Sequence, residues 1–127
     1  MAQNGSVKPG DTFLFSPTGG NVHLWVVLHV YVPDLEFDEW AVIALVTSTT
    51  ARTTQDLLTC QVGNGDHPYL VHGSYVLYQA TAQYELAKLP EGCRHQPCSA
   101  ALLERIQRGA HASRHTQRGM KKLVPNP

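Results

Sequence analysis

Two long runs of β-branched, aromatic and other apolar residues dominate the first half of the chain. They read "VHLWVVLHVYV" at residues 22–32 and "EWAVIALVTST" at residues 39–49, with an acidic connector between them. Runs of this composition, bounded by turn residues, are typical of strands. A connector this short is that of a hairpin, so the chain is constrained to fold around antiparallel β-structure.

Other segments continue the β pattern. The candidates are "DTFLF" (11–15), "LLTCQV" (57–62) and "GSYVLYQATAQYEL" (73–86), of which the last is long enough for one or two strands. Strands punctuated by Gly, Pro and Asn, without an alternation of strands and helices, predict an antiparallel barrel or sandwich. The sequence shows no internal repeat.

The pattern changes to helical after residue 98. Ser99 is a suitable N-cap, "AALLERIQR" places Leu102, Leu103 and Ile106 on one face, and Gly109 is a candidate C-terminal stop. We therefore predict a mainly β domain, a small barrel with a C-terminal helix, over residues 1–109. Residues 110–127 are weakly helical at best, and we expect them to form a basic, mobile tail.

Size and composition fit one domain without a membrane span. The chain has 127 residues, of which 43% are hydrophobic, enough for one core. Neither a signal-peptide apolar region nor a run of roughly 18 apolar residues is present. The three cysteines, Cys60, Cys93 and Cys98, do not suggest a disulfide framework. We expect a soluble, cytoplasmic protein with reduced thiols.

Charge is divided unevenly along the chain, although the formal net charge is zero. Residues 1–93 carry three basic and nine acidic side chains, a net charge of −6. Residues 94–127 carry seven basic side chains and one acidic, a net charge of +6. A basic C-terminal third indicates an anionic partner, an internal contact or self-association, and a merely solvated basic tail is an equally good interpretation.

One candidate site combines His23 with Thr47 and Ser48. These residues stand at the ends of the two long apolar runs and lie side by side if the strands pair. Strand ends hold side chains rigidly, as general acid–base catalysis requires. The alternative is a histidine with a purely structural role.

Three other segments carry chemically active residues. The loop 63–75 contains Asp66 and His67 among turn-forming residues, and is either a turn or a binding loop. "CRHQPC" at residues 93–98 lacks the second ligand pair of a structural zinc site, so we expect neither a metal nor a cofactor. Arg52, in a hydroxyl-rich turn, is either solvated or placed to hold a phosphate.

The order of these motifs resembles that of the PemK/MazF-like plasmid-maintenance toxins. The matching segments, between Pro9 and about Gly109, are "VKPGDTFLF", "GGNVHLWVVL", "AVIALVTST" and "GSYVLYQATAQYELAKL". The resemblance implies a small SH3-like barrel with a C-terminal helix, usually a homodimer. It also implies metal-independent cleavage of single-stranded RNA, by attack of a ribose 2′-hydroxyl on the adjacent phosphate, and control by an antitoxin protein.

The resemblance also implies roles for individual residues. Thr47 matches the family's strand-end Thr or Ser, which would hold a phosphate oxygen, with Ser48 in support. The glycine-rich loop with Gly19, Gly20 and Asn21 would contact the substrate. The segment "NGDHPY" has no counterpart in the family pattern, and we separately expect Asp66 and His67 of the loop 63–75 to bind substrate.

His23 departs from the family pattern, because it stands where the family has an arginine. Arginine is a poor proton carrier at neutral pH, whereas histidine exchanges a proton there. Either His23 acts as acid or base with Arg52 as the charge clamp, or the chain is a catalytically silent barrel that binds nucleic acid or protein. A third interpretation is a different hydrolase or transferase centred on the "GDHPY" loop.

Overall fold

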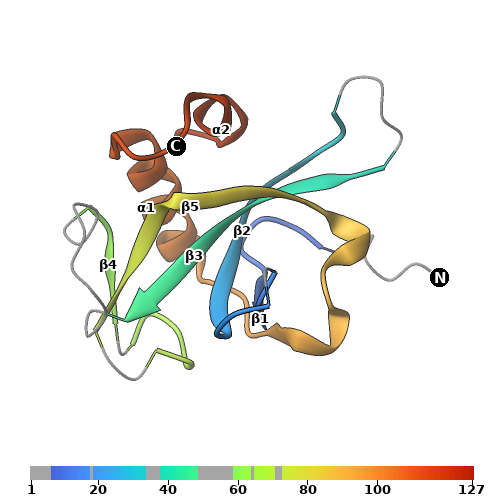
Figure 1. Ribbon diagram of the computed structural model, residues 1–127. Helices are drawn as coiled ribbons and strands as arrows, with labels where there is room; N and C mark the ends of the chain where they lie inside the picture. The colour runs from blue at the N-terminus through green and yellow to red at the C-terminus, as the bar shows by residue number, and fades with distance from the viewer. Residues whose placement is uncertain (1–6, 18, 34–37, 49–58, 64, 71–72) are drawn as a thin grey trace.

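The computed structural model describes residues 7–17, 19–33, 38–48, 59–63, 65–70 and 73–127. Within them a curled sheet is flanked on one side by two helices (Figure 1). The elements are β1 (Thr12–Phe15), β2 (His23–Tyr31), β3 (Trp40–Ser48), β4 (Gln61–Val62), β5 (Ser74–Glu85), the 3-10 helices η2 (Leu86–Lys88) and η3 (Glu91–Cys93), β6 (Arg94–His95), α1 (Ala100–Ala112) and α2 (Arg118–Leu123).

The described strands form one antiparallel sheet in the order β4-β5-β3-β2-β1-β6. The sheet curls into a half-barrel, with β4 and β6 at its two edges. The predicted mainly β fold with a C-terminal helix is therefore confirmed. The segment 73–86 forms the single strand β5 rather than two strands.

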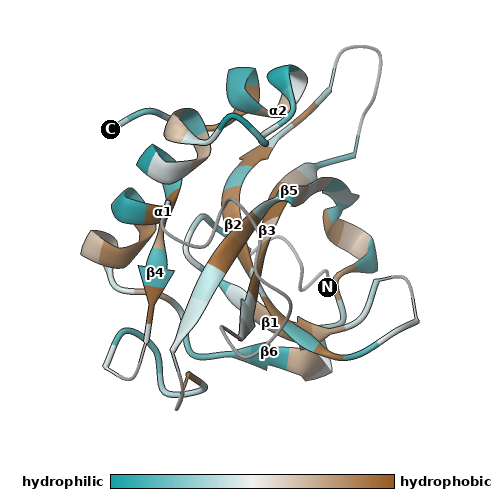
Figure 2. Cartoon of the chain, turned by 60° about the vertical axis from the view of Figure 1, so that its left-hand side comes forward, coloured by the Kyte–Doolittle hydropathy of each residue, from teal (hydrophilic) through white to brown (hydrophobic). Residues whose placement is uncertain are grey.

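Alternating side chains build a core on each face of the sheet. On β2, Leu24, Val26 and Leu28 belong to a first cluster, which includes helix residues such as Ile106. Their neighbours Trp25 and Val27 belong to a second cluster on the opposite face, together with Phe13, Phe15, Ile43 and Leu45. This two-residue period is the ordinary consequence of strand geometry. Figure 2 shows the hydrophobic residues running along the central strands.

A β-bulge interrupts the pairing of β2 with β3. Val27 pairs with Ile43 and His29 with Val42, so Leu28 is an extra residue on β2. The carbonyl of Leu28 accepts a hydrogen bond of 2.9 Å from Nε2 of Gln107, a buried side chain of α1. Because a buried carbonyl without a partner is costly, this contact helps fix the position of the helix over the sheet.

The C-terminal region differs from the expectation of a helical stop at Gly109 and a mobile tail. Ser99 caps α1 as predicted, accepting from the Leu102 N–H, but the helix continues to Ala112. Gly109 lies inside α1, against the ring of Tyr78. Glycine is needed there for close packing rather than for a turn.

Residues after α1 are also packed on the sheet. α2 follows at Arg118–Leu123, and Met120, Leu123 and the buried Val124 contact the first cluster. His111 Nε2 donates to the carbonyl of Val124 at 2.7 Å. Sequence reasoning missed this arrangement because apolar residues are sparse in the segment. In the described part of the chain, no helix is long and apolar enough to cross a membrane.

The β1–β6 edge is held by a buried carboxylate. Asp11 accepts a bond of 2.8 Å from Arg94 Nη1, and its Oδ2 also accepts the backbone N–H of Lys8. Arg94 also pairs with Glu91 and stacks over the Phe13 ring at 5.2 Å. The Gly-Asp motif before the first strand therefore has a structural role, because it anchors β6.

Candidate functional site

His23 and Thr47 lie at the same end of neighbouring strands. The last paired residues of β2 and β3 at this end are Leu24 and Val46. His23 and Thr47 are the next residues outward on their strands, and both side chains are half-buried. On its other side, the backbone of His23 is paired with Phe15 of β1. The two sequence-predicted residues are thus placed at a common sheet end, and their strands are well anchored.

Of the other residues predicted for this site, the structure describes the glycine-rich turn fully, Ser48 only in its backbone and Arg52 not at all. Gly19, Gly20 and Asn21 form an exposed turn before His23, in which Gly19 has a φ of 85°. Such a positive φ favours glycine. The backbone of Ser48 pairs with Ser74 at the end of β3, but the Ser48 side chain lies outside the described residues, as does all of Arg52.

A row of strand-end residues connects Thr47 with helix α1. Thr47 pairs with Tyr75 of β5, and Tyr75 pairs in turn with Gln61 of β4. The carbonyl of Gln61 accepts a 2.9 Å bond from Arg105 Nη2. Neighbouring strands are about 4.8 Å apart, so Arg105 reaches the same end of the sheet two strands away from Thr47.

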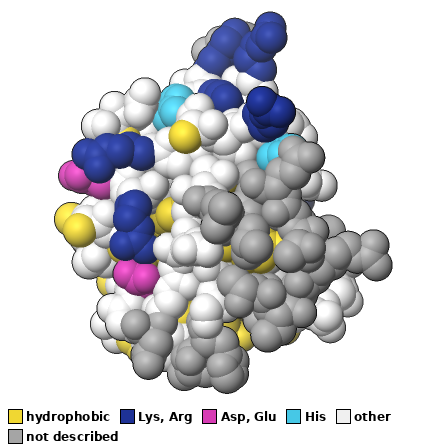
Figure 3. Space-filling model, turned by 90° about the vertical axis from the view of Figure 1, so that its left-hand side faces the viewer, with side chains coloured by type: hydrophobic (Ala, Val, Ile, Leu, Met, Phe, Trp, Pro, Cys, Tyr) yellow, Lys and Arg dark blue, Asp and Glu magenta, His cyan; other side chains and the backbone are white. Residues whose placement is uncertain are grey.

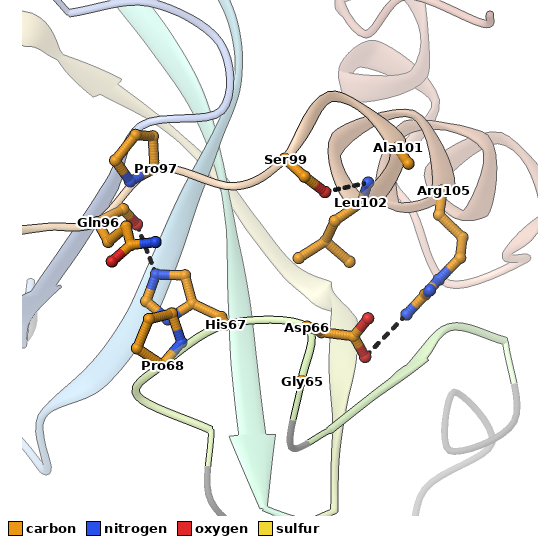
Figure 4. Close-up of a pocket in the computed structure, with 10 residues that line it drawn as sticks. All are labelled: Gly65, Asp66, His67, Pro68, Gln96, Pro97, Ser99, Ala101, Leu102 and Arg105. Atoms are coloured by element: carbon orange, nitrogen blue, oxygen red, sulfur yellow. Dashed lines mark hydrogen bonds and ion pairs between the residues drawn. The ribbon is translucent and has the colours of Figure 1, made fainter.

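The loop 63–70 and the segment 93–98, which the sequence singled out separately, come together at the start of α1. With the first turns of that helix they enclose a pocket of about 490 Å³ (Figure 4). This volume falls within the usual range of small-ligand pockets. Its lining residues are Gly65, Asp66, His67, Pro68, Gln96, Pro97, Ser99, Ala101, Leu102 and Arg105.

Asp66 and Arg105 form one wall of this pocket. Asp66 Oδ2 accepts the backbone N–H of Gly63 at 2.8 Å and pairs with Arg105 Nη2 at 3.2 Å. Sequence reasoning missed Arg105, because its partner Asp66 lies 39 residues away in the sequence. The neighbouring residues Asp66 and His67 have different partners: Asp66 binds Gly63 and Arg105, and His67 binds Tyr69 and Gln96.

The buried ring of His67 is engaged at both nitrogens. Nδ1 accepts the backbone N–H of Tyr69 at 3.1 Å, so the ring proton must lie on Nε2. Nε2 then donates to the carbonyl of Gln96, which also accepts the Thr12 hydroxyl at 2.8 Å. Burial lowers the pKa of His67, and the nearby His95 lowers it further. His67 is therefore a neutral cross-link between two loops, without a free nitrogen for proton transfer.

This arrangement predicts a pH dependence of stability. The pKa of His67 is lower in the folded chain than the ordinary value of about 6.5 in the unfolded chain. Below about pH 6.5 the unfolded state therefore binds more protons, and stability falls as pH decreases. At higher pH the contribution is fully present. We expect His67→Gln to lose less stability than the native chain between about pH 7 and about pH 5.

The measurement is urea unfolding of both proteins across that range. The difference between their slopes should not exceed about 1.4 kcal/mol per pH unit, the value for one proton. Parallel curves would show that His67 titrates alike in the folded and unfolded chains.

The two thiols of "CRHQPC" lie on different sides of the sheet. Cys93 packs against the second hydrophobic cluster, and Cys98 packs against the first. Burial, together with the carboxylates of Asp11 and Asp66, raises the pKa of the Cys98 thiol to about 11. The described cysteines are free thiols, and these two are not placed as a pair of ligands for one ion.

The strand-end site and the pocket lie on opposite faces of the sheet. Thr12, which contacts His67, pairs with Val26 of the first cluster. His23 shares its strand face with Trp25 of the second cluster. The strand-end residues have hydroxyl and imidazole groups suited to phosphate contact and proton transfer, and the pocket supplies an ion pair and amide groups. A search of protein-family models and of curated proteins finds no match to this chain.

Proposed function

We propose that this protein is an endoribonuclease similar to the PemK/MazF-like toxins, cleaving single-stranded RNA without a metal ion. The placement of His23 and Thr47 at one end of adjacent, paired strands is the observation that supports it most directly. Such a position keeps a histidine and a hydroxyl within one rigid framework, as acid–base catalysis on a phosphate requires.

The reaction needs a base, an acid and stabilisation of the phosphate. The ribose 2′-hydroxyl loses its proton and attacks the adjacent phosphorus, while the bond from phosphorus to the 5′-oxygen breaks. The leaving 5′-oxygen takes up a proton, so the products are a 2′,3′-cyclic phosphate and a 5′-hydroxyl. In this proposal His23 moves one of these protons and the Thr47 hydroxyl donates to a phosphate oxygen, with Ser48 in support.

Charge stabilisation falls to Arg52 in the same proposal. An arginine fork matches the geometry of phosphate oxygens and keeps its charge throughout the neutral range. The glycine-rich turn at residues 19–21 would let the RNA backbone approach closely. An antitoxin that covers this end of the sheet would control the activity, and two copies of the chain would form the active homodimer.

RNA ends provide the direct test of this proposal. Purified protein is incubated with single-stranded RNA in EDTA, and the products are identified by mass spectrometry. We expect cyclic phosphate and 5′-hydroxyl ends, and no cleavage of a matched strand with 2′-deoxyribose at every position. Cleavage that depends on a divalent ion, or that leaves 5′-phosphate ends, would contradict the mechanism.

A catalytically silent binding module is the second candidate. It is favoured by the replacement of the family arginine by His23, together with the basic side chains on α1 and α2. Expression in a bacterial host separates the two candidates. Growth arrest that His23→Ala relieves supports the nuclease, and harmless expression supports the binding module.

A further inference from the structure

The basic C-terminal third of the chain is folded into a surface rather than spread along a tail. We define the basic helical surface as the side chains of Arg105, Arg108, Arg114, Arg118, Lys121 and Lys122. Figure 3 shows the side of the molecule that carries the helices, with Lys and Arg side chains spread over it. Helices packed on a sheet hold such charges at defined positions, which a mobile tail does not.

The cations of this surface differ in their acidic partners. Arg105 pairs with Asp66, and Arg108 pairs with Glu104 at 3.5 Å between side chains that are both more than half exposed. Among the described residues, no ion pair involves the cations beyond α1, namely Arg114, Arg118, Lys121 and Lys122. Four cations close in sequence and without such partners repel one another, and a polyanion relieves that repulsion.

The basic helical surface and the row of strand-end residues that starts at Thr47 meet at Arg105. Arg105 contacts Gln61, which is joined through Tyr75 to Thr47 by strand pairing. From Arg105, the next exposed cation on α1 is Arg108, three residues further on the same helix face. The strand-end site and the helices lie on opposite faces of the sheet, and β4 is the edge strand between them. A chain of phosphates that leaves the strand-end site past the ends of β5 and β4 therefore turns around the β4 edge and meets the helices at Arg105.

We propose that the basic helical surface binds the phosphates of the single-stranded RNA that extends beyond the strand-end site. This inference rests on the proposed function for the identity of the strand. The contacts are electrostatic and independent of base sequence, because the surface presents charges rather than a groove that reads bases. Its role is to raise affinity and to hold the strand in register with the site.

The composition of the surface favours RNA over a protein partner. Protein interfaces have an apolar or aromatic centre from which charged residues, and lysine in particular, are depleted. The large hydrophobic residues exposed in the described chain are Val22, Val32 and Tyr69, none of which lies on α1 or α2. The large apolar side chains of α1 and α2 are thus at least partly buried, while most of the cations are exposed, as expected for a phosphate-binding face.

Salt dependence of binding tests this proposal. The probe is a single-stranded RNA of mixed sequence with 2′-O-methyl groups throughout, which lacks the attacking hydroxyl and so stays intact. Its affinity is measured by fluorescence anisotropy over a range of salt concentrations. Each phosphate contact contributes about 0.7 to the slope of log affinity against log salt.

The test variant is Arg118→Gln/Lys122→Gln, which removes two exposed charges of α2. We expect its slope to fall by up to ~1.4, which corresponds to about 25-fold weaker binding at 0.1 M salt if the affinities converge at 1 M. The matched control is Lys8→Gln/Lys88→Gln, which removes the same charge from exposed positions outside the helices. The control should keep the native slope, and thermal unfolding should show that both variants are folded.

The outcomes separate this inference from the proposed nuclease activity. Equal slopes for the test and control variants, or failure of the native protein to bind the probe, would overturn the RNA-binding surface. If the slopes are equal and the native protein still cleaves ordinary RNA, the nuclease proposal stands without the RNA-binding surface. Conversely, a reduced slope for the α2 variant, without cleavage of ordinary RNA by the native protein, would support the surface and refute the nuclease.

Discussion

Replacing His23 by alanine is expected to slow RNA cleavage by ~10²- to 10⁴-fold, the usual contribution of one general acid or base. The reason is that His23 stands at the end of β2, beside the end of β3 that carries Thr47, and supplies the proton-transfer group of the proposed site. Single-turnover cleavage of a labelled RNA, measured across the neutral pH range, gives both the rate and its pH dependence.

A second variant distinguishes proton transfer from charge alone. His23→Arg restores the residue of the toxin family, and it should keep appreciable activity with a flatter pH profile, since guanidinium stays charged. His29→Ala, which removes another half-buried histidine of β2, is the matched control and should cleave at nearly the native rate. Loss of activity in His67→Ala at a temperature where it is folded, with His23→Ala active, would move the chemistry to the loop 63–70.

Replacing Gly109 by alanine is expected to destabilise the fold by about 1–3 kcal/mol, the usual cost of overpacking a core. A β-carbon at this position would meet the hydroxyl oxygen and Cζ of Tyr78, which leave no room for it. The Tyr78 hydroxyl also donates to the carbonyl of Ile106 at 2.7 Å, so moving the ring strains a buried hydrogen bond. Urea unfolding measures the change in free energy.

Gly119 in α2 provides the control for this prediction. A β-carbon there has no neighbour within 4 Å, and alanine has the higher helix propensity by about 1 kcal/mol. Gly119→Ala is therefore expected to be neutral or stabilising. In a Tyr78→Phe background, Gly109→Ala should cost less, because the nearest colliding atom is gone. Equal effects of the two glycine substitutions would refute the packing argument.

Strands β1, β2, β3 and β5 were predictable because each has a strong local pattern. Of the expected strand 57–62, the described residues form a strand only at Gln61–Val62, and residues 57–58 lie outside the described part. The expected run 11–15 begins one residue before β1 and ends with it. The runs 22–32 and 39–49 extend one residue beyond β2 and β3 at both ends. Ser99 as N-cap was predictable from residue type and the apolar spacing that follows it. β6 was not, because two residues have no periodicity and this strand depends on Arg94 reaching Asp11, 83 residues earlier.

The candidate site shows the same division between local and distant information. Sequence order was enough to place His23 and Thr47 at strand ends, and pairing of β2 with β3 brings those ends together. The roles of His67 and Arg105 depended on partners 29 and 39 residues away in the sequence. No local pattern specifies such contacts, so a histidine that looked available in a loop is in fact occupied on both sides of its ring.

The hydrogen bond from Gln107 to the Leu28 carbonyl couples the sequence changes that the chain tolerates at two distant positions. The carbonyl it satisfies is available because strand β2 has one residue more than its partner. Deleting Leu28 would leave the buried side-chain amide of Gln107 without its acceptor. Replacing Gln107 by an apolar residue would leave the buried carbonyl of Leu28 without its donor. Each change is costly while the other feature remains. In descendants of this chain, the strand insertion and the helix glutamine should therefore be inherited or lost together.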